Sequence, residues 1–281
     1  MRLGIFAKTF PGTTPDVVIT AARAAGFSAV QYNMACSGLA SMPDVIPPGI
    51  AESVSTARHQ AGVEISAVSG TYNMVHPDPM VRAQGLERLK VLAGACAGLG
   101  TPLITLCTGT RDPDDQWRGH PDNDTPEAWR DLLAEMEKAI RIVDRFDVNL
   151  GIEPELANVV NSALQARRLI DELQSPRLKI VLDPANLFET EPLAVQRDIV
   201  SASIDLLDDR IVMGHAKDRT ATGAFATAGE GIIDFPHYIG RLKAIGFEGP
   251  LITHGLEAHE APSVAAFLTR ALAEQGVEIV P

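Results

Sequence analysis

The chain has 281 residues, 46% of them hydrophobic, and a formal net charge of -12. This length and apolar content suit one large domain with a substantial core. The acidic balance argues against nucleic acid or an anionic membrane as a partner, because both would be repelled electrostatically.

Eight short apolar runs recur along the chain and predict strands. Runs that are apolar on both faces are typical of parallel strands covered by helices. The eight runs are 3–6, 29–32, 64–68, 103–107, 150–153, 180–183, 211–215 and 251–254.

Amphipathic stretches lie between these runs and predict helices. They include 15–25, 50–61, 80–99, 126–146, 162–173 and 235–245. The alternation predicts an α/β fold, a (β/α)8 TIM barrel that forms a single domain over residues 1–281. A doubly wound open sheet is the alternative.

Four of the predicted strands are each preceded by a glycine that follows a helical stretch. These residues are Gly26, Gly62, Gly100 and Gly246. A glycine at this place is expected to end the helix in the left-handed conformation and to turn the chain into the strand.

The chain has three cysteines, Cys36, Cys96 and Cys107, without a repeating spacing. Such a set does not make a disulfide framework, and small buried hydrophobic side chains are the expected role. No charged-then-apolar leader opens the chain, and no apolar run reaches the roughly 18 residues of a membrane span. The prediction is a reduced, cytoplasmic protein without a membrane partner.

The last four apolar runs each end on a residue that can bind a metal. These residues are Glu153, Asp183, His215 and His254. If the runs are neighbouring parallel strands, the four side chains converge at one edge of the sheet and form a divalent-metal site. The expected ion is Mn, Zn, Co, Fe or Mg, since calcium prefers a shell of oxygens alone. Glu257 competes with His254 as the fourth ligand.

Two long connections, 108–125 and 219–234, follow strand ends on the same side as these ligands, where loops shape a substrate pocket. Predicted substrate contacts lie in these loops or after other strands. They are Tyr72, His76, Thr108, Arg111, Trp117 and Asn186, with Asn33, His120 and Glu155 as further candidates. Lys217 would steady an anionic oxygen, and Asp218 would support a ligand.

Glu153 at the end of the fifth strand, Asp183-x-x-Asn186 after the sixth and His215-x-Lys217-Asp218 after the seventh resemble the xylose isomerase-like TIM barrels of the sugar phosphate isomerase/epimerase type. The resemblance covers essentially the whole chain. It implies metal ligands at Glu153, Asp183 and His215. Relatives that epimerise ketoses have a second glutamate after the eighth strand, whereas this chain has His254.

The resemblance implies a metal-dependent isomerase or epimerase of a sugar or sugar derivative. A metal that holds adjacent carbonyl and hydroxyl oxygens would acidify the C–H bond between them and stabilise an enediolate. Glu153 or His254 would be the base, with Lys217 as a third catalytic residue. The expected partner is a small carbohydrate, and a homo-oligomer, either dimer or tetramer, is left open.

Three other functions compete with this one. The first is a lyase on the same scaffold, either a keto-polyol dehydratase or a 3-keto-glycoside deglycosidase. The second is an abasic-site endonuclease, which would need more ligands and a less acidic chain. The third is a sugar-binding protein without catalysis.

Overall fold

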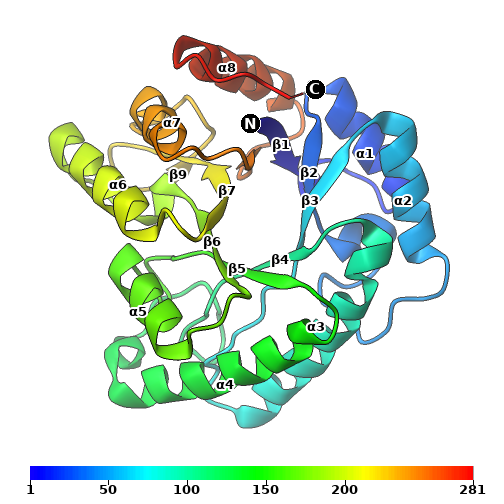
Figure 1. The fold of residues 1–281 in the computed structure, drawn as a ribbon, viewed down its shortest axis with the longest axis vertical. Coiled ribbons are helices and arrows are strands. Elements are labelled where there is room, and N and C mark those ends of the chain that lie inside the picture. Colours follow the sequence, from blue (N-terminus) through cyan, green and yellow to red (C-terminus); the bar gives the residue numbers. More distant parts are fainter. Residues whose placement is uncertain (281) are drawn as a thin grey trace.

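The alternating apolar and amphipathic segments form a closed barrel of eight parallel strands surrounded by helices (Figure 1). The computed structural model describes residues 1–280. Each barrel strand pairs with its neighbours in chain order, and the last strand closes the barrel against the first. The barrel strands are β1 (Arg2–Phe6), β2 (Ala29–Tyr32), β3 (Glu64–Ser69), β4 (Leu103–Leu106), β5 (Asn149–Ile152), β6 (Leu178–Leu182), β7 (Ile211–Ala216) and β10 (Pro250–Thr253).

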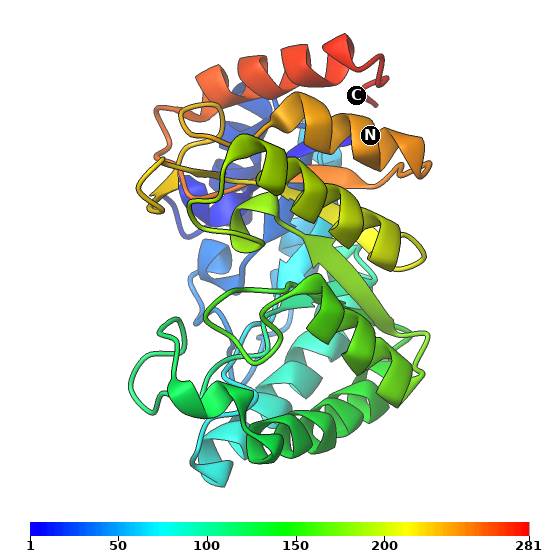
Figure 2. The same ribbon diagram turned by 90° about the vertical axis from the view of Figure 1, so that its left-hand side faces the viewer.

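Long helices follow the strands and cover the outside of the barrel, where Figure 2 shows them packed side by side. They are α1 (Pro15–Ala24), α2 (Ile50–Ala61), α3 (Pro79–Leu99), α4 (Pro126–Asp144), α5 (Ala163–Leu173), α6 (Leu193–Leu207), α7 (Phe235–Ala244) and α8 (Ala261–Glu274). Four short 3-10 turns also occur: η1 (Ala7–Thr9), η2 (Met34–Ser37), η3 (Pro121–Asp124) and η4 (Pro184–Asn186). No helix within residues 1–280 is both long and apolar enough to cross a membrane.

The structure confirms the predicted barrel and adds elements that the sequence pattern did not reveal. The predicted barrel implied the helices α6 and α8 without giving their bounds, and neither has a side-chain hydrogen bond that caps its first turn. The connection after β7 also contains a short antiparallel ribbon of β8 (Asp218–Arg219) and β9 (Phe225–Ala226). The predicted glycine caps are confirmed: Gly62 and Gly100, for example, have φ angles of +64° and +84°.

The core has two apolar layers, one on the outer face and one on the inner face of the barrel sheet. The larger layer lies between the strands and the helices. A smaller cluster, with Ala29, Ala67, Leu103, Val181, Met213 and Ile252 buried in it, comes from strand residues alone and fills the barrel. Glycine is required beside this cluster at Gly4, where an added Cβ would lie 2.4 Å from the Cδ1 atom of Ile252. Burial of each large aliphatic side chain stabilises the fold by about 1.5–3 kcal/mol.

Two residues beyond this inner cluster, the strands change from apolar to polar side chains. Ala29 is followed by Gln31, Val181 by Asp183, and Ile252 by His254. Because side chains alternate across a strand, a step of two residues returns to the same face. The barrel interior is therefore apolar in one layer and polar in the next layer toward the carboxyl ends of the strands, where TIM barrels place their sites.

Candidate metal centre

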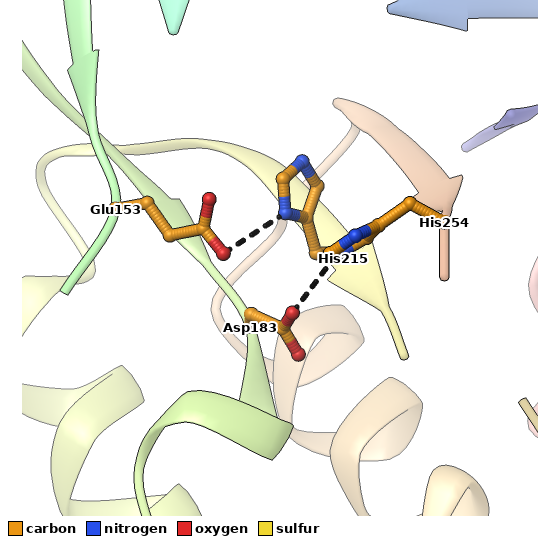
Figure 3. A group of neighbouring side chains, drawn as sticks. All are labelled: Glu153, Asp183, His215 and His254. Carbon is orange, nitrogen blue, oxygen red and sulfur yellow. Dashed lines mark hydrogen bonds and ion pairs between the residues drawn. The ribbon is translucent and has the colours of Figure 1, made fainter. Parts of the chain in front are cut away.

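The polar layer brings together four side chains that could hold a metal ion, Glu153, Asp183, His215 and His254 (Figure 3). One ligand atom from each lies within 4.8 Å of the others. Glu153 follows β5 directly, Asp183 follows β6, His215 lies in β7 and His254 follows β10. Leu182 pairs with Gly214 in the sheet, so the next residues of β6 and β7, Asp183 and His215, stand at the same level.

Each histidine contacts one carboxylate of this cluster. The Nδ1 atom of His215 lies 3.2 Å from Oε1 of Glu153, and Nε2 of His254 lies 3.0 Å from Oδ2 of Asp183. The two imidazole rings are 4.5 Å apart between centroids. Of the four side chains, that of His254 is the most open, with 21% of its surface exposed, whereas that of Asp183 has none.

The electrostatics keep Glu153, Asp183 and His254 in forms that bind cations. Burial would raise the pKa of Asp183, but the charge of Lys217 and the contact with His254 hold this pKa well below its usual range. Burial likewise opposes ionisation of Glu153, and His215 reverses the effect and lowers the pKa. Burial and the charge of His215 lower the pKa of His254. Ionised carboxylates and neutral imidazoles are the states that ligate divalent ions.

The donor set fits a divalent transition-metal ion. Two carboxylates and two imidazoles suit Mn, Fe, Co or Zn, and the cluster lies where a cation would offset two crowded, buried negative charges. The open side at His254 leaves space for substrate oxygens. Each ligand would come from a different strand, with Glu153 after β5, Asp183 after β6, His215 in β7 and His254 after β10.

Gln31 fixes the orientation of the His215 ring from the opposite wall of the barrel. Its Nε2 donates to the hydroxyls of Ser69 and Thr105 at 3.1 and 3.0 Å. Its Oε1 must therefore face the Nε2 atom of His215, which lies 2.8 Å away and donates. This leaves the Nδ1 atom of His215 directed at Glu153 and available to a metal.

Asn186 and Lys217 connect the two carboxylates. The Nδ2 atom of Asn186 donates to Oε1 of Glu153 at 2.8 Å, and Lys217 Nζ donates to Oδ1 of Asn186 at 3.1 Å. Lys217 Nζ also lies 3.5 Å from Oδ2 of Asp183 and 3.7 Å from the centre of the Phe225 ring. Lys217 is thus a buried cation at the edge of the cluster.

A pocket of about 500 Å³, here called the central pocket, opens above the cluster. A cavity of this size is typical of small-molecule sites. Among the predicted contacts, Asn33, Trp117, Glu155, Asn186 and Lys217 line it. Trp117 comes from the loop after β4, and 52% of its surface is exposed.

Four predicted substrate contacts lie outside the central pocket, and each has its own hydrogen-bond partner there. Tyr72 turns its hydroxyl toward buried Glu135, and the His76 ring bonds the backbone of Pro113 and Asp78. Thr108 is fully buried and accepts a hydrogen bond from the backbone of Val160. Arg111 is paired with Asp131 at 2.8 Å.

Three further predicted residues, His120, Glu257 and Asp218, also lie outside the central pocket. His120 accepts a hydrogen bond from the backbone N–H of Asp122 at the start of η3. Glu257 is exposed beside a separate hollow near Lys8, away from the cluster. The carboxylate of Asp218 accepts four backbone N–H groups, from Arg219, Gly229, Gly231 and Ile233, and so organises the loop after β7.

Sequence reasoning missed several lining residues of the central pocket. They include Gln31, Ser69 and Thr105. The sequence signal that could have identified them is a polar side chain inside or at the end of an otherwise apolar strand. Phe225 was not considered because the ribbon that carries it was not predicted. The three cysteines are buried as predicted, and Cys107 lies 3.9 Å from Glu153 through its Sγ atom.

The chain matches a protein-family model and also individual proteins of known name. The family model described as xylose isomerase-like TIM barrel matches residues 19–278. The L-ribulose-5-phosphate 3-epimerase UlaE of Shigella flexneri serotype 5b is 28% identical over 195 residues, which cover 68% of this chain. The match spans 63% of that relative's own length.

Solved structures with the same fold share less sequence. A 3-keto-D-glucoside 4-epimerase from E. coli has a TM-score of 0.77 at 16% identity, covering 96% of this chain and 99% of its own. A D-psicose 3-epimerase from Clostridium cellulolyticum H10, solved with D-tagatose, has a TM-score of 0.74 at 15% identity, covering 97% and 99%. At such identities the likeness shows the fold alone.

Proposed function

The chain belongs to the xylose isomerase-like TIM barrel family, and from that membership we propose that it is a metal-dependent epimerase or isomerase of a keto-sugar. The observation that carries the proposal is the convergence of Glu153, Asp183, His215 and His254 within 4.8 Å at the base of the central pocket. The sequence relative that is an L-ribulose-5-phosphate 3-epimerase supports it. We take residues 1–281 as one functional domain.

The four ligands would hold the cation, and Mn, Fe, Co and Zn fit the donor set best. A bound divalent ion would polarise the sugar carbonyl and make the neighbouring C–H bond more acidic. The residues of the chain must then remove and return the proton.

Glu153 and His254 are placed to transfer protons on different faces of a sugar. They follow β5 and β10, which are separated in the barrel by β6 and β7. A sugar above the cluster would therefore meet a carboxylate on one side and an imidazole on the other. Epimerisation needs such a pair, because the proton leaves one face and returns to the opposite face. An aldose–ketose isomerisation needs only one of them.

Lys217 and Asn186 would bind the oxygen that gains negative charge. Both side chains line the central pocket, and both are fixed by the hydrogen bond between them. Donors held in position before the reaction stabilise a developing charge without reorganisation. Asn186 also donates to Glu153, so it helps to hold the proposed base in place.

The experiment that tests the proposal measures the incorporation of deuterium from the solvent into the sugar. Metal-loaded protein is incubated with ketoses in D2O, and proton NMR follows exchange at the carbon next to the carbonyl. We expect exchange with formation of a new epimer or isomer, and none after removal of the metal by a chelator. Release of water or of an aglycone would assign a lyase instead. Absence of any stoichiometric divalent ion, both in purified protein and after metal addition, would refute metal dependence.

A further inference from the structure

The central pocket does not end at the metal cluster but adjoins a second concave site, here called the side hollow. The side hollow has a volume of about 490 Å³ and includes Tyr72, His76, Gln84 and Arg88 in its lining. Thr71 and Gln116 line both cavities. The two spaces are therefore neighbours, with these two residues between them.

The loop after β4 forms the boundary between the two spaces. Asp115 faces the side hollow, Gln116 faces both spaces, and Trp117 faces the central pocket. A ligand that stacks on the exposed Trp117 ring would lie beside Gln116, the preceding residue, which borders the side hollow. Single-sugar chemistry requires only the central pocket, so the side hollow has no role in it.

The lining of the side hollow suits a neutral polar group better than an anion. It contains three carboxylates, Asp112, Asp114 and Asp115, of which buried Asp112 is paired with Arg118 at 2.5 Å. Its guanidinium, Arg88, is already paired with Asp44 at 2.7 Å. A phosphate would meet more negative than positive charge there. Carboxylates and the amides of Gln84 and Gln116 are instead suitable partners for sugar hydroxyls.

From this geometry we propose that the side hollow is a second sugar subsite. The substrate would then be a keto-sugar that carries a glycosidically linked, uncharged sugar. The keto-sugar occupies the central pocket above the metal cluster, and the linked sugar passes Gln116 and binds in the side hollow. This inference rests on the proposed function, because it assigns the keto-sugar to the central pocket.

Calorimetric titration of the manganese-loaded protein tests the subsite without depending on turnover. The probes are D-fructose, 6-O-glucosyl-fructose, 4-O-galactosyl-fructose and fructose 6-phosphate. We expect at least one disaccharide to bind about tenfold or more tighter than fructose, the gain of about two hydrogen bonds. Equal affinity for fructose and both disaccharides, tighter binding of the phosphate, or no binding of either disaccharide would overturn the proposal.

Two variants on α3 locate the effect. Gln84→Trp fills the side hollow from an exposed position and should abolish the preference for the disaccharide while fructose binds as before. Ala83→Trp, on an exposed neighbour that does not line the side hollow, is the matched control and should change neither. A preference that survives Gln84→Trp would place the second sugar elsewhere and refute the assignment.

The binding and exchange experiments separate the two proposals. Deuterium exchange with fructose, combined with no preference for disaccharides, would leave the proposed function intact and remove the subsite. A disaccharide preference that Gln84→Trp abolishes, combined with no exchange for any ketose, would keep the subsite and remove the proposed reaction.

Discussion

The Nε2 atom of His254 lies 3.0 Å from the Oδ2 atom of Asp183, although 71 positions separate the two residues. Asp183 follows β6 and His254 follows β10, with β7 between them. The contact joins the last strand of the barrel to the buried carboxylate of the candidate metal site. It places an imidazole at the most exposed edge of the four-residue cluster.

His254→Ala should weaken manganese or zinc binding by at least about 100-fold. Loss of a residue that only hydrogen-bonds to a ligand already costs about 10–100-fold in metal affinity, and loss of a direct ligand should cost no less. His254→Glu should keep the affinity within about tenfold, since it restores a carboxylate ligand. Competition with a fluorescent chelator measures both. His259→Ala, at an exposed histidine, is the control. Full affinity in His254→Ala together with loss in Glu257→Ala would assign the fourth ligand to Glu257.

Gln31→Leu should weaken metal binding by about 10–100-fold although Gln31 is not a ligand. The variant removes the acceptor of the His215 Nε2–H group, so the ring is no longer fixed with Nδ1 toward Glu153. Calorimetric titration with manganese measures the change. Gln60→Leu, at an exposed glutamine of α2, should have no effect. Unchanged affinity in Gln31→Leu would show that other contacts suffice to orient His215.

Lys217→Met should destabilise the metal-free protein by about 3 kcal/mol, because it leaves the buried carboxylate of Asp183 without its nearest cation. The loss should be smaller with metal bound, since the ion supplies positive charge at the same carboxylate. Urea unfolding with and without manganese measures both values. The exposed lysine variant Lys90→Met should change stability by less than about 0.5 kcal/mol. Equal losses in both states would contradict the reasoning.

Cysteine alkylation should be slow in the native protein and should stay slow as the pH rises to about 9. Burial raises the pKa of Cys36 to about 11 and that of Cys96 to about 12. A raised pKa keeps the thiol protonated, and the thiolate is the reactive form. Mass spectrometry after iodoacetamide treatment measures the labelling. All three thiols should react in urea, and rapid labelling of native Cys36 or Cys96 would contradict the burial.

The sequence by itself determined the barrel and the order of the four residues that could bind a metal. Apolar runs of strand length, separated by amphipathic stretches, leave few folds that bury both faces of a parallel sheet. Because parallel strands end on the same side, residues at the ends of the last four runs had to approach one another. The positions of Glu153, Asp183, His215 and His254 followed from this periodicity alone.

Only the tertiary structure decided what surrounds these four residues. The contact of Gln31 with His215 joins residues 184 positions apart across the barrel, and no local pattern encodes such a pair. The loops after β4 and β7 have no periodicity, so their turns and hydrogen bonds decide where Trp117 and Phe225 lie. The same reason separates Tyr72 and His76 from the central pocket, since a loop position fixes neither the direction of a side chain nor its partner.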